Sequence, residues 1–349
     1  MKLDERKMML SAPALAEVQR AHGAAVAELL DPQRPHANVV GVGAGVKWRN
    51  GEPTGEPALV VLVAQKLVKS VLVADDLVPD KVADMQTDVL AIGHVIAGRG
   101  EPLDASAQTL AKRARPARGG YSVGHTDITA GTIASCVYDM LPGSTVSPPA
   151  HGIGVPQRYY VLSNNHVLAD SNNARLGDFI LQPGPFDGGA DPADRIATLS
   201  RFISITFDPP FPRAQHRNLV DAAIAEGAFH ELDREIYWSG PVRGWRQKAN
   251  VAVGTLVKKT GRTTNFTVGR ITAINATVDV GYDAGRVARF VDQMITTNLS
   301  AGGDSGSLVT TLDNVAVGLL FAGSSVATIV NHFEHVRALL RVEVTEQIL

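Results

Sequence analysis

The chain has 349 residues and a formal net charge of −2, from 33 Lys and Arg against 35 Asp and Glu. The length suggests about two domains, and an apolar fraction of 45% excludes global disorder. The balanced charge argues against a general nucleic-acid-binding protein, so no nucleic-acid partner is expected. A single cysteine excludes a disulfide scaffold. The 33 glycines and 19 prolines favour a turn-rich, mainly β fold.

The sequence predicts neither a secretory signal nor a membrane-spanning segment. The opening MKLDERKMML lacks the apolar core of roughly 7–15 residues that a secretory signal needs. The least charged later stretch, Val315–Val330, is shorter than the roughly 20 residues that span a bilayer. We therefore expect a soluble, cytoplasmic protein with no membrane partner.

Residues 1–35 predict a helical segment, which ends at Asp31-Pro32 because a proline disfavours the helical state of the residue before it. This helix could bind a partner or a second copy and so form a homo-oligomer. Packing against its own chain is the more common use of an amphipathic face. The apolar residues at helical spacing are Leu15, Val18, Val26, Leu29 and Leu30.

Residues 36–100 predict a small α+β module, because VVGVGAGVKW and ALVVLVAQK are rich in Val and punctuated by Gly, as strands are. The run Gly41–Gly45 lacks the Lys-Ser/Thr and the helix that follow a phosphate loop. No cofactor is therefore expected from this module.

Residues 101–119 predict a linker. Its basic residues have no interleaved aromatic residues, which favours a solvated, protease-sensitive segment over a nucleic-acid site. They are Lys112, Arg113, Arg115 and Arg118.

From 120 to 349, short apolar runs such as YYVLSNN and RIATLSRFISI alternate with turn signals. This pattern is typical of paired β-barrels or sandwiches. Near the end, NHFEHVRALLRV predicts a helix.

The same region carries the residue types of nucleophilic catalysis. Ser305 lies in GGDSGS, His166 ends an apolar strand in LSNNHV, and Asp221 is embedded in the apolar LVDAAIA. A histidine can take the serine's proton and return it to a leaving group, and a carboxylate holds the imidazole tautomer. The glycines beside the serine would let the N–H groups of Gly303 and Ser305 form an oxyanion hole.

Other candidates fit less well. Cys136, in the apolar GTIASCV, is expected to be a buried hydrophobe rather than a nucleophile. His332 and His335 share a helix face without a third ligand, so no metal is expected. An α/β-hydrolase elbow is excluded because Ser307 replaces its last glycine. Strand context favours Asp221 over the other acids between His166 and Ser305, which are Asp170, Asp178, Asp194 and Asp233.

Together, NNHV, VDAAIA and GGDSGS resemble the trypsin/chymotrypsin-fold serine peptidases. LSNNHVLA, VKKTGRTTNFTVGRI and GLLFAGS further resemble their bacterial and plant narrow-leaf-type subgroup. The resemblance implies a chymotrypsin-like double β-barrel over 120–349, with a small N-terminal α+β module and a C-terminal helix. It also implies a serine endopeptidase that acts on a protein or peptide through an acyl-enzyme, with substrate bound along Phe321, Ala322 and Gly323.

The resemblance also places Leu299 at the base of the pocket for the residue before the cleaved bond (P1). An apolar base disfavours Lys and Arg, so small or apolar P1 residues are expected. Trypsin-like zymogens free an N-terminus that pairs with the acid before the serine, here Asp304. No Ile-Val-Gly-Gly occurs near residue 120, so we expect a competent full-length chain or regulation by the N-terminal module.

Two other functions stay open. The chain could be a catalytically weak binding or scaffold protein that grips a peptide on a protease fold. It could also process only its own chain or one dedicated partner, although the basic Lys112–Arg118 segment suits an apolar pocket poorly.

Overall fold

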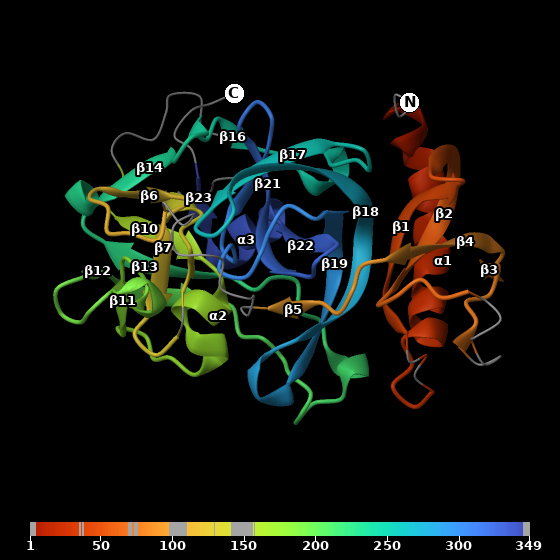
Figure 1. Ribbon diagram of the computed structural model, residues 1–349, viewed down its shortest axis with the longest axis horizontal. Helices are drawn as coiled ribbons and strands as arrows, with labels where there is room; N and C mark the ends of the chain where they lie inside the picture. Colours follow the sequence, from red (N-terminus) through yellow and green to blue (C-terminus); the bar gives the residue numbers. More distant parts are fainter. Residues whose placement is uncertain are drawn as a thin grey trace.

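The computed structural model describes residues 5–34, 36, 38–68, 72, 76–97, 110–128, 130–140, 156 and 158–344. Strands dominate these residues, with one long helix near the N-terminus and one near the C-terminus (Figure 1). The predicted mainly β fold is therefore confirmed. No helix in the described ranges has both the length and the hydropathy needed to cross a membrane.

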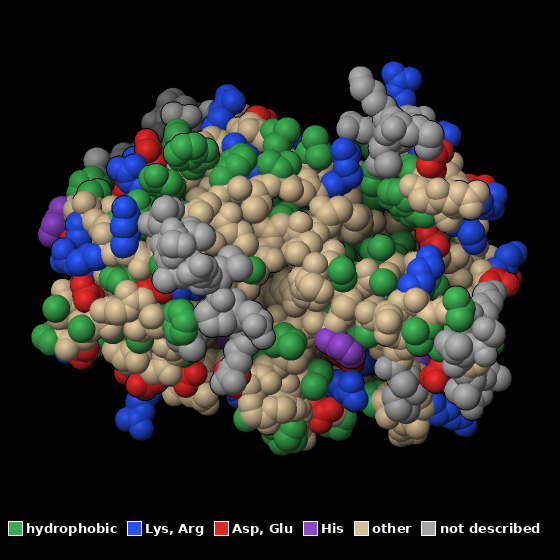
Figure 2. All heavy atoms as spheres, viewed as in Figure 1, with side chains coloured by type: hydrophobic (Ala, Val, Ile, Leu, Met, Phe, Trp, Pro, Cys, Tyr) green, Lys and Arg blue, Asp and Glu red, His purple; other side chains and the backbone are tan. Residues whose placement is uncertain are grey.

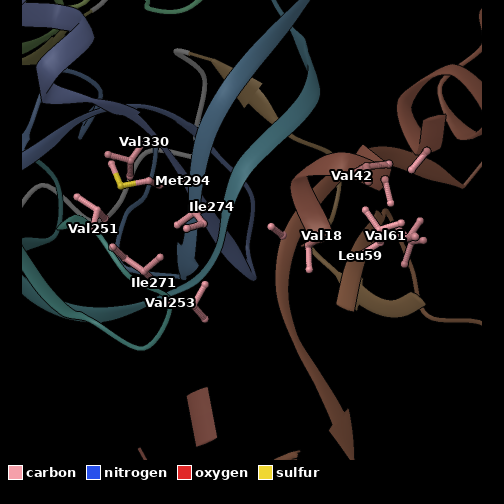
Figure 3. Packing of buried hydrophobic residues seen from close by; sticks show 14 of the residues in the cluster. Val18, Val42, Leu59, Val61, Val251, Val253, Ile271, Ile274, Met294 and Val330 are labelled. Carbon is pink, nitrogen blue, oxygen red and sulfur yellow. The ribbon is translucent and has the colours of Figure 1, made fainter. Parts of the chain in front are cut away.

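The N-terminal module is a helix laid on a small sheet. Ser11 caps the helix, because its Oγ accepts a hydrogen bond from the Ala14 N–H at 3.3 Å. Val18 is fully buried and packs in one cluster with Val42 and Leu59, so the helix packs on its own chain (Figure 3). The elements of the module are a 3₁₀ turn (Glu5–Met8), α1 (Ala12–Leu29), β1 (Val39–Arg49), β2 (Glu52–Val63), β3 (Lys81–Val82), β4 (Met85–Ala91) and β5 (Ile96–Ala97).

The glycine run of β1 serves a sheet contact. β1 pairs antiparallel with β18 (Asn265–Gly281), and Gly41 lies opposite Val278. A Cβ on Gly41 would come within 2.6 Å of the Thr277 carbonyl oxygen, so a larger residue would push the strands apart. The sheet of the module thereby continues into the C-terminal half of the chain.

The first β unit after the module is an antiparallel sheet with the strand order β23-β9-β10-β13-β12-β11-β7-β8, and a smaller sheet, β15-β14-β6, lies beside it. Its elements are β6 (Ala117–Gly119), β7 (Ser122–His125), β8 (Gly131–Thr132), β9 (Ser135–Asp139), β10 (Tyr159–Ser163), α2 (Asn165–Leu168), β11 (Phe179–Leu181), β12 (Arg195–Phe202), β13 (Ala223–Gly227), β14 (Leu232–Ile236), β15 (Gly240–Pro241) and β23 (Val342–Glu343).

The second half of the predicted linker differs from a solvated segment. Residues 101–109 lie outside the described residues, but Leu110 is buried in the core of the first β unit. Arg113 pairs with Asp194 at 3.0 Å, and Arg115 donates to the Gln182 side chain. Pairing with acids and amides, which composition alone does not reveal, holds these arginines on the protein.

The second β unit contains the strands β17-β20-β21-β22-β19-β18, and β1 follows β18 in the same sheet. Its remaining elements are β16 (Gly244–Trp245), β17 (Leu256–Gly261), β19 (Val287–Thr297), β20 (Leu308–Thr311), β21 (Val315–Gly323), β22 (Ala327–His332) and α3 (Phe333–Leu340). One-turn 3₁₀ helices lie in the connections of both units, at Asp170–Asn172, Pro185–Asp187, Arg213–Gln215, Phe229–Glu231, Lys248–Asn250 and Asp283–Gly285.

The candidate site lies where the two β units meet. His166 is on α2, directly after β10, and Asp221 precedes β13, so both come from the first unit. Ser305 precedes β20 and therefore comes from the second unit. Figure 2 shows that the face is hollowed near its centre, where Figure 1 places β5.

Candidate active site

His166 and Asp221 form a buried pair. The His166 Nδ1 lies 2.6 Å from Asp221 Oδ2, and the His166 backbone N–H donates to Asp221 Oδ1 at 3.1 Å. Asp221 has no exposed surface, so its charge depends on these partners. Among the aspartates weighed from the sequence, Asp178, Asp194 and Asp233 pair instead with His125, Arg113 and Arg118.

Three further side chains hold Asp221, and their contacts with it were not predicted from the sequence. Tyr282, directly after β18, donates its hydroxyl to Asp221 Oδ2 at 2.7 Å. Asn331 accepts from the Asp221 N–H at 3.0 Å, and Asn164 donates to its carbonyl oxygen at 2.7 Å. Burial, followed by the charge of Asp221, raises the pKa of Tyr282 well above its ordinary value. The hydroxyl therefore stays protonated and donates at every physiological pH.

Ser305 is buried at the edge of the same site. Its Oγ lies 3.5 Å from the Phe321 carbonyl oxygen, the long limit of a hydrogen bond, so a χ1 rotation can redirect it cheaply. The His166 Nε2 has no hydrogen-bond partner among the described residues. Thr132 joins the two halves, because its N–H donates to the Ser305 carbonyl and its own carbonyl accepts from Ser163 Oγ.

The backbone around Ser305 leaves two donors available. Within the described part of the chain, the N–H groups of Gly303 and Ser305 have no acceptor. Gly303 has φ of +93°, and a Cβ there would lie 2.5 Å from both Arg262 Nη1 and Thr263 Oγ1. The turn therefore requires glycine at this position.

Asp304 is neutralised from within the chain. Its carboxylate receives Lys259 Nζ at 3.1 Å, the Thr263 N–H at 2.8 Å and the Ala301 N–H at 3.0 Å. Neither side chain of the Lys259–Asp304 pair is exposed. Burial lowers the pKa of Lys259, and the adjacent Asp304 opposes this shift. The sequence contained Lys259 in VKKTGRTTNF, but nothing in that motif revealed its partner.

Of the residues expected to bind substrate, those on β21 lie near Ser305, but Leu299 does not line an open pocket. Phe321, Ala322 and Gly323 form the end of β21, beside Ser305. The Leu299 side chain is only 3% exposed and packs in the hydrophobic core rather than facing an open pocket. Next to it, the hydroxyls of Ser300 and Thr328 lie 2.6 Å apart.

The remaining candidates lie outside this site. Cys136 is buried on β9 in the core of the first β unit. His335 pairs with Asp292 at 2.7 Å, and His332 ends β22 beside it. Among the described residues, no cluster of three His, Cys, Asp or Glu side chains could hold a metal ion.

Comparison with known proteins links this chain to serine peptidases. No family model matches it. A stretch of 73 residues is 41% identical to glutamyl endopeptidase 2 of Streptomyces griseus. The match covers 20% of this chain and 34% of that relative, so the chain spans about a third of the relative's length.

Two solved structures are similar in a larger part of the chain. Protease A of Thermobifida fusca is 17% identical, with 65% of this chain and 96% of that chain covered and a TM-score of 0.42. Chymotrypsin of Cellulomonas bogoriensis is 20% identical, with 66% and 98% covered and the same TM-score of 0.42. The match to glutamyl endopeptidase 2 confirms the predicted resemblance to serine peptidases.

Proposed function

We propose that the protein is a serine endopeptidase with Ser305 as nucleophile, His166 as general base and Asp221 as the orienting acid. The observation that carries the proposal is the buried Asp221–His166 pair, which fixes Nδ1 and leaves Nε2 without a hydrogen-bond partner among the described residues. The next residue, Val167, and the Ser305 carbonyl oxygen both lie within 3 Å of where a Cβ on Gly131 would be, so the two segments meet there. Asp221 thereby selects the tautomer that can accept a proton at Nε2. The likeness to a glutamyl endopeptidase over 73 residues supports the same reaction class.

The chemistry follows from these positions. Ser305 Oγ attacks the substrate carbonyl carbon while its proton passes to His166 Nε2, and the carbonyl oxygen takes the negative charge. The N–H groups of Gly303 and Ser305 would stabilise that oxyanion. The imidazolium then protonates the leaving amine, which leaves an ester on Ser305 that water hydrolyses by the same steps.

A Ser305→Ala variant tests this proposal. It should lose labelling by a small alkyl fluorophosphonate and lose peptide hydrolysis by about 10³-fold or more, because the covalent intermediate cannot form. Ser200→Ala, a half-buried serine on β12, is the matched control and should keep both. Hydrolysis by Ser305→Ala at the wild-type rate would overturn the assignment, and a wild-type chain that is neither labelled nor active would favour a binding or scaffold protein.

Activation needs no new N-terminus in this proposal. In the resembled zymogens a freed amino group pairs with the acid before the serine, but here Lys259 already supplies an ammonium to Asp304. This contact supports a chain that is competent without cleavage near residue 120. The packing of Arg113 and Arg115 on the first β unit also speaks against a self-processing site there.

We further propose that the P1 pocket takes an acidic side chain, in place of the small or apolar one expected from Leu299. Leu299 lies in the core, whereas the Ser300 and Thr328 hydroxyls can donate to a carboxylate. A Cβ added to Gly323 on β21 would come 3.3 Å from Ser300 Oγ, so these hydroxyls lie beside the substrate strand. The partial match to a glutamyl endopeptidase points the same way.

Peptides that differ only at P1 separate the two expectations. The peptide with Glu at P1 should exceed those with Leu and Ala in kcat/KM by about tenfold or more. Ser300→Ala should lower kcat/KM selectively for the Glu peptide. Ser325→Ala, on the β21–β22 turn, serves as the control. A preference for Leu or Ala that Ser300→Ala leaves unchanged would restore the apolar expectation.

A further inference from the structure

A two-residue strand of the N-terminal module lies in the candidate site. β5 leaves the module and pairs antiparallel with β21, with Ile96 opposite Gly323 and Ala97 opposite Ala322. Its other edge pairs parallel with β18 at Gly281. β5 therefore lies between β21 and β18 and pairs with both. Figure 1 shows β5 apart from the rest of the N-terminal module, near the middle of the molecule.

The segment leading into β5 is also anchored. The Gly281 N–H donates to the Val95 carbonyl oxygen at 3.1 Å, and the Ser324 hydroxyl donates to the Ile92 carbonyl oxygen. Val95 and Ala97 are each 5% exposed and pack in one cluster with Phe321 and Ala322. These contacts hold the segment in a defined register rather than resting it loosely on the surface.

The direction of β5 is that of a bound substrate. From Ile96 to Ala97 the chain runs from Gly323 toward Phe321, whose carbonyl oxygen contacts Ser305 Oγ. Ala97 and His166 line the same cavity of about 140 Å³. In a peptide that is to be cleaved, the residues before the attacked carbonyl approach the nucleophile in this way. The residues after Ala97 lie outside the described residues.

We propose that Val95–Ala97 is an internal ligand of the peptide-binding edge of β21 and competes with substrate for it. The proposal rests on the proposed function, since it requires that Ser305 act on peptides bound along β21. It assigns the site to extended peptides with small or β-branched apolar side chains where Ile96 and Ala97 now lie. Strand addition of this kind draws its affinity from main-chain hydrogen bonds.

Tethering makes even weak pairing effective. A segment joined to the site by a short connection has an effective concentration of about a millimolar, so a millimolar intrinsic affinity suffices for substantial occupancy. The N-terminal module then limits access of peptides without filling the small cavity that His166 lines. Small and peptidyl reagents should therefore respond differently to the loss of β5.

The test compares the wild-type chain with Ile96→Pro, which removes an N–H and disfavours strand pairing. Val68→Pro is the matched control, because Val68 is an exposed apolar residue of the same module outside its strands. Ile96→Pro should react about tenfold faster with a peptidyl phosphonate, as expected for the loss of one or two main-chain hydrogen bonds. Its labelling by a small alkyl fluorophosphonate should stay within about twofold of wild type.

The outcomes separate the two proposals. Equal peptidyl labelling of wild type, Ile96→Pro and Val68→Pro, with normal labelling by the small reagent, would overturn the internal ligand alone. A wild-type chain that the small reagent does not label would overturn the proposed function. A second measurement avoids the variant: hydrogen exchange of wild type with a saturating peptide aldehyde should release the Ile96 and Ala97 amides, and unchanged protection would also sink the proposal.

Discussion

Asp221 and Asp304 both lack exposed surface, and each lies next to a residue that we propose to react, but their partners differ. Asp221 faces an imidazole, which can take up a proton, and a phenol, which stays protonated and donates a hydrogen bond. Asp304 faces the Lys259 ammonium and backbone N–H groups, which take no part in the proposed proton transfer. In our proposal the first carboxylate therefore supports proton transfer at His166, and the second fixes the shape of the turn that carries Ser305.

This difference has an energetic consequence. A buried ion pair gains little over an apolar pair of the same shape, but removal of one partner leaves an uncompensated charge and costs about 3–5 kcal/mol. The Asp221 carboxylate instead has no ammonium to lose, because it accepts from the His166 ring, the His166 backbone N–H and the Tyr282 hydroxyl. Variants should therefore affect stability most in the Asp304 half and rate most in the Asp221 half.

The largest expected effect is that of Lys259→Met. Without the ammonium, the Asp304 carboxylate is buried with backbone and threonine donors only, and we expect a loss of about 3–5 kcal/mol in the free energy of unfolding. Urea denaturation measures it. The neighbouring Lys258→Met is the control, since its ammonium lies 6.0 Å from the Phe266 ring and is hydrogen-bonded to no acid among the described residues. Equal stability of the two variants would show that the pair is not what holds this turn.

His332 gives the next largest effect and belongs to the Asp221 half, because it follows Asn331 on β22. Burial lowers the pKa of His332 to about 4, against the opposing charge of Asp292, while His335 and Lys248 add to the shift. The unfolded chain binds this proton first, so stability falls as pH drops from the ordinary histidine pKa of 6.5 toward 4. The loss amounts to about 3 kcal/mol.

Denaturation at several pH values checks this expectation. His332→Gln should flatten the stability curve between pH 6.5 and 4, and the exposed His230→Gln should not. A curve that His332→Gln leaves equally steep would assign the acid sensitivity elsewhere.

The sequence predicted the parts of the site that local motifs carry. Ser305, His166 and Asp221 each lie in a short, recognisable context, and the first strands and both long helices follow from apolar spacing. Tyr282 and Lys259 could not be predicted in this way. Their contacts join residues 61 and 45 positions apart, and each depends on how one strand ends against a loop of another.

Two other features required the three-dimensional structure for a different reason. The pairing of β5 with β21 is a contact between a short, unremarkable V-I-A and a strand end far along the chain. Leu299 occupies the position along the chain that is expected for the base of the P1 pocket. Its backbone N–H, however, donates to the Thr328 hydroxyl, and its side chain packs in the core. Spacing along the chain places a backbone position, and packing decides where the side chain lies.

The smallest expected effect, from Tyr282→Phe, tests whether the Asp221 half governs rate. Its ring stays packed against Phe207 and Phe290, so the fold should be retained, but Asp221 Oδ2 loses a donor. We expect kcat to fall about tenfold with KM little changed. Tyr237→Phe, whose ring packs on Tyr121, is the control. A loss of stability with kcat unchanged would reduce Tyr282 to a packing residue.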